Sequence, residues 1–162
     1  MIKKVICVFL IGLVLSCNFE KPVQFSHEAL NEKLNTLKGE SITLESVLNK
    51  YKGQTILIDV WASWCADCIK GMPDVKALQN EFNDVEFVFL SVDRNEAIWK
   101  RSIQKYNVRG EHYFVPTGQN GAFGDFLNSN WIPRYMVIDK EGSIELFKAK
   151  RATDSRIKEA LK

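Results

Sequence analysis

Apolar residues recur along the middle of the chain with two spacings, which predict alternating strands and helices. The almost unbroken apolar run at 55–62 predicts a central strand that is buried on both faces. Apolar residues at helical spacing then predict a helix over 65–82, followed by an apolar strand at 85–92 and a helix at 95–106. Pro73 lies inside the first of these helices, where the loss of one backbone hydrogen bond predicts a kink.

The segments around this unit are shorter and more polar. Leucines in 27–38 predict a short helix or an irregular lead-in, 41–44 an edge strand, and 45–51 one or two helical turns. After the second helix, 107–130 contains several glycines and predicts a long loop. A loop of this length in a compact domain often forms the rim of a functional site.

A hairpin and a final helix complete the pattern. Two strands are predicted at 131–139 and 143–149, joined by a turn at 140–142, and Thr153 or Asp154 is the expected N-cap of the last helix. The order of elements predicts an α/β fold of three layers, in which a mixed central β-sheet is flanked by helices on both faces.

The first residues of the chain have the pattern of a bacterial export signal. Lys3 and Lys4 precede an apolar run at 5–15, which is shorter than the roughly 20 residues needed to span a bilayer. The sequence Val-Leu-Ser-Cys at 14–17 resembles a lipobox, so we expect cleavage before Cys17 and lipidation of that cysteine. The alternative is cleavage nearby, which would leave Cys17 as a free thiol.

Composition is consistent with one domain behind this signal. The chain has 162 residues, 46% of them hydrophobic, and a net charge of +2. We expect a signal peptide at 1–17, a polar tether at 18–26 and a single domain at 27–162. The lysines are scattered, so the charge pattern gives no reason to expect nucleic acid as a partner.

This organisation leaves two cysteines in the domain. Of the four cysteines in the chain, Cys7 would leave with the signal and Cys17 would carry lipid, so Cys65 and Cys68 remain. One pair in an exported domain of this size predicts catalysis rather than a disulfide scaffold.

A metal site is not expected at this pair. Structural zinc sites need four ligands, whereas the two histidines of the chain, His27 and His112, lie far apart in the sequence. We therefore expect no metal ligands and interpret both histidines as ordinary surface or loop residues.

The C-x-x-C pair itself lies where the central strand gives way to a helix. The unpaired N–H groups and the positive end of a helix dipole stabilise a thiolate there, which makes the first cysteine reactive. Asp59, inside the apolar strand, is a second unusual feature, because an isolated carboxylate is costly to bury. The alternative for Asp59 is a strand-end acid that faces solvent.

With these features the chain resembles the thioredoxin superfamily, and within it the exported TlpA/ResA-like thiol-disulfide oxidoreductases. The resemblance covers about residues 25–162. The residues that carry it are Asp59-Val60-Trp61-Ala62-Ser63-Trp64-Cys65-Ala66-Asp67-Cys68, Pro73, Ile132-Pro133 and Val137-Ile138-Asp139-Lys140-Glu141-Gly142. It implies a thioredoxin-like fold and no cofactor other than the redox-active disulfide Cys65–Cys68.

The resemblance also implies a role for each site residue. Cys65 would be the nucleophile, Cys68 would resolve the mixed disulfide, and Asp59 would assist the loss of a proton from Cys68. Pro133 matches the family's cis-proline, which lies against the disulfide; the alternative is a trans proline at the start of an edge strand.

Three residues are expected to contact the substrate. Ile132 and Pro133 would present free backbone to an extended substrate segment, as in strand addition. Trp64 would shape the surface beside the nucleophile, a role that suits it better than Trp61; either tryptophan could instead be a plain core residue.

The sequence departs from the family at Ala66-Asp67, where a proline commonly precedes the second cysteine. The charge of Asp67 should oppose a thiolate at Cys65 and make the protein a poorer oxidant. We therefore expect Ala66 and Asp67 to tune the redox potential toward reduction.

The sequence thus predicts a lipid-anchored disulfide reductase of the bacterial cell envelope, on the extracytoplasmic or periplasmic face. Its expected partners are exported proteins that carry disulfides and a membrane thiol protein that donates electrons. Two alternatives stay open: a non-catalytic, lipid-anchored binding module with a thioredoxin-like surface, and a peroxide-reducing relative.

Overall fold

The computed structural model of the protein describes residues 21–128 and 131–162. The predicted signal peptide, the lipidation site Cys17 and the first residues of the tether lie outside the described residues. Within those two ranges, no helix has both the length and the apolar character needed to cross a membrane.

A seven-stranded mixed sheet forms the centre of the molecule, with the strand order β2-β1-β5-β4-β3-β6-β7. Its strands are β1 (Lys33–Thr36), β2 (Ser41–Thr43), β3 (Ile56–Trp61), β4 (Glu86–Ser91), β5 (Glu111–Phe114), β6 (Arg134–Ile138) and β7 (Ile144–Ala149). Strands β3, β4 and β5 are parallel, whereas β6 runs antiparallel to β3 and to β7.

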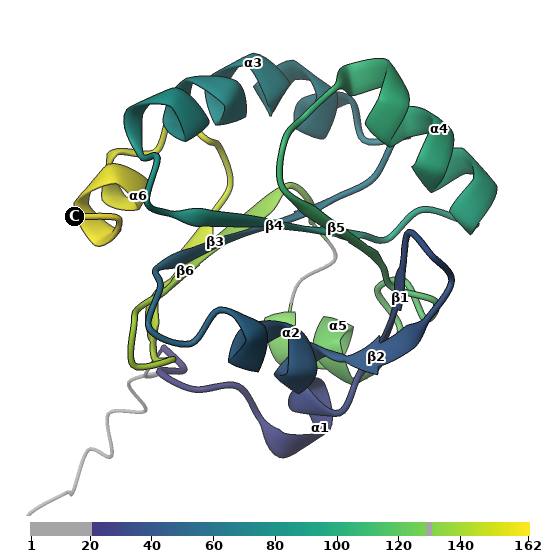
Figure 1. Ribbon diagram of the computed structural model, residues 1–162, viewed down its shortest axis with the longest axis horizontal. Coiled ribbons are helices and arrows are strands. Elements are labelled where there is room, and N and C mark those ends of the chain that lie inside the picture. Colours follow the sequence, from purple (N-terminus) through teal and green to yellow (C-terminus); the bar gives the residue numbers. More distant parts are fainter. Residues whose placement is uncertain (1–20, 129–130) are drawn as a thin grey trace, which may run out of the picture.

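Helices cover both faces of the sheet, as the sequence predicts (Figure 1). They are α1 (His27–Leu30), α2 (Leu44–Lys50), α3 (Ala66–Glu81), α4 (Glu96–Tyr106), α5 (Ala122–Leu127) and α6 (Ser155–Ala160). Helices α3 and α4 lie on one face, and α1, α2 and α5 lie on the other (Figure 1). Helix α6 joins the α3 side, where Lys158 forms a 2.6 Å ion pair with Glu81 at the end of α3.

The central strand β3 is buried along its whole length. Helices cover both of its faces, and β4 and β6 pair with its two edges, so every side chain of the strand lies in the interior. The predicted strands, the predicted helices after β3 and β4, and the position of Pro73 inside α3 are confirmed. The N-cap of α6 is Asp154, one of the two expected residues.

The prediction of a continuous loop over 107–130 is wrong. The segment contains strand β5 and helix α5, and β5 pairs with both β4 and β1. Gly110 makes the entry into β5 possible: its φ is +126°, and a Cβ atom there would lie 2.5 Å from the carbonyl oxygen of Phe87. Gly110 is therefore needed for the close packing of β5 against β4, although from the sequence it suggests a loop.

The lead-in at 27–38, expected to be a short helix or an irregular segment, contains a strand as well as a helix. Helix α1 ends at Leu30, and the chain then forms strand β1, in which Leu34 is fully buried. Pairing with β2 and β5 stabilises this strand, although Leu34 also fits a helical spacing with Leu30 and Leu37.

The interpretation of His112 as an ordinary surface or loop residue is wrong as well. This residue lies in β5, is buried, and stacks on the ring of Phe89 with a centroid distance of 4.7 Å. Burial lowers the pKa of His112 below its usual value. His27, by contrast, is accessible in α1.

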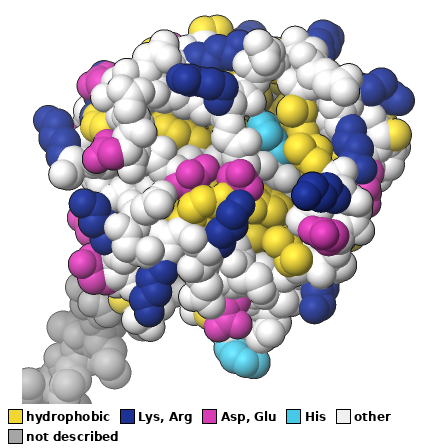
Figure 2. All heavy atoms as spheres, in the orientation of Figure 1, with side chains coloured by type: hydrophobic (Ala, Val, Ile, Leu, Met, Phe, Trp, Pro, Cys, Tyr) yellow, Lys and Arg dark blue, Asp and Glu magenta, His cyan; other side chains and the backbone are white. Residues whose placement is uncertain are grey.

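Basic and acidic side chains are interspersed over the face of the molecule shown in Figure 2. This face therefore carries no large field of a single sign, in keeping with the scattered lysines of the sequence.

Candidate active site

Strand β3 delivers the C-x-x-C pair to the start of helix α3. Cys65 is the N-cap of α3, and its Sγ atom accepts a hydrogen bond of 3.1 Å from the backbone N–H of Cys68. The two cysteines form a disulfide bond. Cys65 is 7% exposed and Cys68 only 2%, so Cys65 is the more accessible of the two sulfurs. In the reduced protein, the same N–H group would stabilise a thiolate at Cys65.

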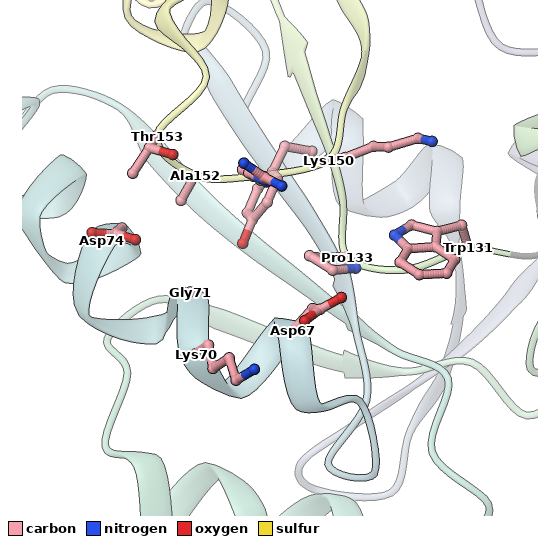
Figure 3. Close-up of a pocket in the computed structure, with 11 residues that line it drawn as sticks. Asp67, Lys70, Gly71, Asp74, Trp131, Pro133, Lys150, Ala152 and Thr153 are labelled. Carbon is pink, nitrogen blue, oxygen red and sulfur yellow. The ribbon is translucent and has the colours of Figure 1, made fainter.

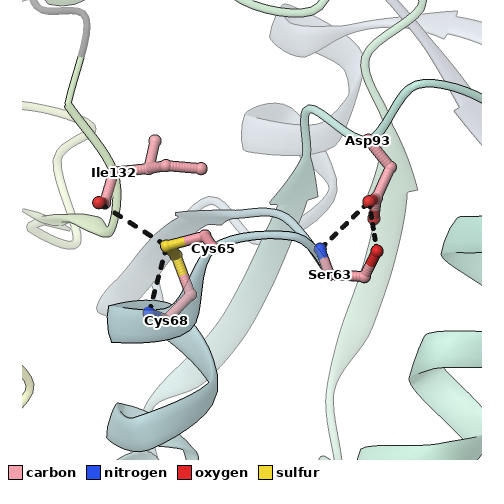
Figure 4. The surroundings of a disulfide bond; sticks show 5 residues. All are labelled: Ser63, Cys65, Cys68, Asp93 and Ile132. Atoms are coloured by element: carbon pink, nitrogen blue, oxygen red, sulfur yellow. Dashed lines mark hydrogen bonds between the residues drawn. A yellow bond between two sulfur atoms is a disulfide. The ribbon is translucent and has the colours of Figure 1, made fainter.

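The loop before β6 approaches the disulfide from the other side (Figure 4). The peptide bond between Ile132 and Pro133 is cis, as the resemblance implies. The carbonyl oxygen of Ile132 lies 3.6 Å from the Sγ atom of Cys65, where it can accept a hydrogen bond from a thiol. The structure thus brings together residues that are widely separated in the sequence.

Asp93 anchors the loop that carries Cys65, a contact that the sequence interpretation missed. One oxygen of Asp93 accepts from the backbone N–H of Ser63 at 3.0 Å and from its hydroxyl at 2.6 Å (Figure 4). The other oxygen accepts from the hydroxyl of Ser91 at 2.8 Å. The sequence signal for this contact is a polar residue directly after the apolar strand β4. Because the carboxyl ends of parallel strands meet at one edge of a sheet, such a residue is expected near the end of β3 and the cysteines.

Replacement of Asp93 with alanine should destabilise the protein by roughly 2–4 kcal/mol, because it leaves the buried hydroxyl of Ser91 and the half-buried donors of Ser63 without an acceptor. Urea denaturation of the oxidised protein measures this loss. The matched control is Asp84→Ala, which removes an exposed aspartate and should stay within about 0.5 kcal/mol of the wild type. Equal stabilities for both variants would contradict an anchoring role for Asp93.

Asp59 is buried in the middle of β3, as predicted, with an exposed fraction of 1%. Its Oδ1 atom has no hydrogen-bond partner among the described residues. Burial alone raises the pKa of Asp59 to about 8, from an ordinary value of 3.8. A carboxyl group in this state can exchange a proton near neutral pH.

The strand register places Asp59 beneath the helix face that carries Cys68. Asp59 pairs with Tyr135 of β6, so the two side chains share a face of the sheet. A Cβ atom on Gly71 of α3 would lie 3.2 Å from the Tyr135 hydroxyl, so this is the face that α3 covers. Cys68 and Gly71 are three positions apart on α3 and therefore point to the same side of the helix.

Of the four tryptophans, Trp61 and Trp99 are buried in the core, whereas Trp64 and Trp131 lie at the surface. Trp61 is buried and packs edge-on against Tyr106, with ring centroids 6.5 Å apart. Trp64, directly before Cys65, is 53% exposed, and so is Trp131, directly before Ile132. Trp64 therefore has the surface position expected of it, whereas Trp131 was predicted only as the start of a strand. Two accessible aromatic rings next to the site in sequence suit contact with a polypeptide.

Ala66 and Asp67 form the first turn of α3, and Asp67 also lines a groove beside the site. The groove has a volume of about 450 Å³. Figure 3 shows Asp67, Lys70 and Asp74 on α3 along one side and Lys150 and Thr153 on the other, with Pro133 between Asp67 and Lys150. Among the residues that the structure describes, no group of three or more His, Cys, Asp or Glu side chains could hold a metal ion.

Comparison with known proteins agrees with this geometry. A family model described as thioredoxin-like matches residues 53–144. The thiol-disulfide oxidoreductase ResA of Bacillus thuringiensis is 24% identical over 127 residues, which cover 77% of this chain and 69% of ResA. The thioredoxin-like protein YneN of Bacillus subtilis is 27% identical over 130 residues, or 78% of this chain and 72% of YneN.

A solved structure extends the likeness to three dimensions. The solution structure described as a thiol-disulfide oxidoreductase of Bacteroides vulgatus is 30% identical to this chain and superimposes with a TM-score of 0.66. The match covers 80% of this chain and 82% of that one. Taken with the disulfide at the start of α3, these matches show that the chain belongs to the thioredoxin-like family and is a thiol-disulfide oxidoreductase with the C-x-x-C pair Cys65 and Cys68.

Proposed function

We propose that the protein is a lipid-anchored reductase that acts on disulfides of exported proteins in the cell envelope. The observation that carries the direction of transfer is Asp67, whose carboxylate lies in the first turn of α3, two residues from Cys65. A negative charge there opposes the thiolate of Cys65, destabilises the dithiol form and so favours donation of electrons. The export signal and the lipobox at Cys17 support the extracytoplasmic location and the lipid anchor.

In the first step the Cys65 thiolate attacks one sulfur of the substrate disulfide. A mixed disulfide forms, and the other substrate sulfur leaves as a thiolate that takes a proton from solvent. The Ile132 carbonyl beside Cys65, together with the accessible rings of Trp64 and Trp131, supports contact with an extended polypeptide at this point.

In the second step Cys68 resolves the mixed disulfide. Ionised Asp59 accepts the proton of Cys68, and the resulting thiolate attacks the Sγ atom of Cys65. The Cys65–Cys68 disulfide forms, and the second substrate sulfur leaves as a thiolate. The protein has given two electrons to the substrate, and a dithiol partner at the membrane then reduces the Cys65–Cys68 disulfide with two electrons of its own, becoming a disulfide itself.

The redox potential tests the direction of transfer. We expect a value below about −200 mV, on the side of thioredoxin at about −270 mV rather than DsbA at about −120 mV. Asp67→Asn should raise the potential by about 10–30 mV, because it removes a charge that opposes the thiolate. Equilibration with glutathione buffers of known potential, followed by trapping of free thiols, measures both values.

The matched control is Asp74→Asn, which removes the same charge about two turns further along α3 and should leave the potential unchanged. A wild-type potential near that of DsbA would contradict the reductase proposal. Trapping with Cys68→Ser in cells would identify the substrates, since this variant cannot resolve the mixed disulfide.

A further inference from the structure

A second hollow continues from the groove beside the disulfide. It has a volume of about 590 Å³ and is lined by Lys21, Lys148, Lys150, Arg151, Thr153, Asp154 and Arg156. Lys150, Arg151 and Thr153 also line the groove that contains Asp67 and Pro133. A chain that occupies the groove can therefore extend into the second hollow without leaving the surface.

The cations of this hollow are available to a ligand, with one exception. Arg156 is held by Asp154 at 2.6 Å and by the Lys148 carbonyl oxygen at 3.1 Å. The other four, Lys21, Lys148, Lys150 and Arg151, are exposed, and none forms an ion pair within the part of the chain that the structure describes. We call these four residues the cationic surface.

Strand β7 accounts for the clustering. Lys148 and Lys150 are exposed while Ala149 between them is buried, so the two lysines project from the same face of the strand's end. Lys21 reaches the hollow because the backbone nearby is tied to β7: the Val23 carbonyl accepts from the N–H of Ile144 at 2.8 Å. Lysines on an edge strand also discourage pairing with other chains. That role does not require a hollow continuous with the active-site groove.

We propose that the cationic surface binds an acidic segment of the protein substrate while Cys65 attacks the substrate disulfide. The inference rests on the proposed function, since it names the substrates that the reductase prefers. The groove itself carries charges of both signs, with Asp67 and Asp74 beside Lys70, Lys150 and Arg151, whereas cations clearly outnumber the single aspartate in the second hollow. The acidic residues are therefore expected at some distance from the reacting cysteine, and more neutral residues beside it.

A protein segment fits this surface better than an anionic membrane does. Lys150, Arg151 and Thr153 belong to both hollows, so a bilayer resting on the cationic surface would also lie against the groove beside Pro133 and obstruct the approach of a substrate. A polypeptide can occupy both hollows at once. The Nζ atom of Lys150 lies 6.0 Å from the centre of the Trp131 ring. The cationic surface is therefore adjacent to an accessible aromatic side chain of the candidate site.

The test compares two disulfide peptides that differ only in a flank of four residues, glutamate in one and glutamine in the other. At low salt the wild-type kcat/KM should be about tenfold higher for the glutamate peptide, and the preference should disappear in 0.5 M NaCl. The triple variant K148E/K150E/R151E should lose or invert the preference, because it reverses the charge of the cationic surface.

The matched control is K33E/K38E/K52E, which makes the same change in net charge at three exposed lysines that line neither the groove nor the second hollow. This variant should keep the preference for the glutamate peptide. Equal kcat/KM for both peptides with the wild type, or equal losses in both triple variants, would overturn the inference. Turnover of neither peptide by any variant would instead reject the proposed function.

Vesicles that contain phosphatidylglycerol distinguish a lipid ligand. Sedimentation of the wild type with these vesicles, lost in K148E/K150E/R151E and accompanied by no preference between the peptides, would assign the surface to the membrane and overturn the proposal. Preference for the glutamate peptide in the absence of vesicles supports it.

Discussion

Cys65→Ser is expected to reduce the rate of insulin reduction to the uncatalysed level. A serine hydroxyl is not ionised near neutral pH and cannot form the mixed disulfide, so the first step of the exchange is lost. The fold should survive, because serine is also a favourable N-cap and can accept from the backbone N–H of Cys68. Insulin turbidity with dithiothreitol as the electron source measures the rate.

Cys68→Ser is the matched control for this result. It keeps the attacking thiol and should accumulate a mixed disulfide with the substrate, whereas Cys65→Ser should accumulate none. Thiol trapping followed by non-reducing electrophoresis separates the two outcomes. Equal and negligible turnover by the wild type and Cys65→Ser would favour the non-catalytic binding module instead.

Asp59→Asn is expected to stabilise the protein at high pH and to slow its reaction. Between pH 3.8 and about 8 the native state holds a proton on Asp59 that the unfolded state has released. The native state therefore binds more protons, and the free energy of unfolding falls as the pH rises through this window. Asparagine does not ionise, so the free energy of unfolding of the variant should fall less between pH 5 and pH 8. The variant should therefore be more stable than the wild type at pH 8. Urea titrations of the oxidised protein at pH 5 and pH 8 measure the difference.

The rate of resolution gives the functional half of this prediction. If ionised Asp59 accepts the proton of Cys68, the wild-type rate should rise with pH toward a plateau above about 8. Asp59→Asn should be slower by about 10²-fold at pH 7 and lack this rise. Stopped-flow measurements with a disulfide peptide give both profiles. Identical profiles for the two proteins would remove Asp59 from the mechanism while leaving its effect on stability intact.

The centre of the fold could be predicted because its signals are local. The apolar run at 55–62 can be buried only between covering layers, and the C-x-x-C pair after it marks the start of a helix. Burial of Asp59 follows from the same run, since a residue inside a strand covered on both faces cannot reach solvent. These features depend on residues that are adjacent in the sequence.

Features that depend on contacts between distant segments were missed. His112 is compatible with the interior because its Nε2 atom lies 3.0 Å from the carbonyl oxygen of Val108 and its ring stacks on Phe89. Arg134 is likewise buried, donates to the Leu127 carbonyl oxygen at 3.2 Å and lies 5.5 Å from the Phe147 ring. From the sequence alone, a polar side chain is expected at the surface, because the groups that would hydrogen-bond to it become its neighbours only after folding.

The candidate site shows the same division. Cys65, Cys68 and Pro133 were identified from motifs, although only the fold brings Pro133 to the disulfide. Asp93 and Lys150 carry no motif, and their positions depend on how β4 and β7 end relative to the site. Charged and polar residues at strand ends can be assigned to the site only when the order of the strands in the sheet is known.

The N-cap of α3 couples the redox state of the protein to the stability of a helix. The atom that accepts the backbone N–H of Cys68 is the reacting sulfur of Cys65, and a thiolate is a stronger acceptor than a disulfide sulfur. Folding and reduction form a closed thermodynamic cycle, so any free energy that the cap gains on reduction also shifts the equilibrium between dithiol and disulfide by the same amount. Substitutions that fray the first turn of α3 should therefore change the redox poise without touching either cysteine.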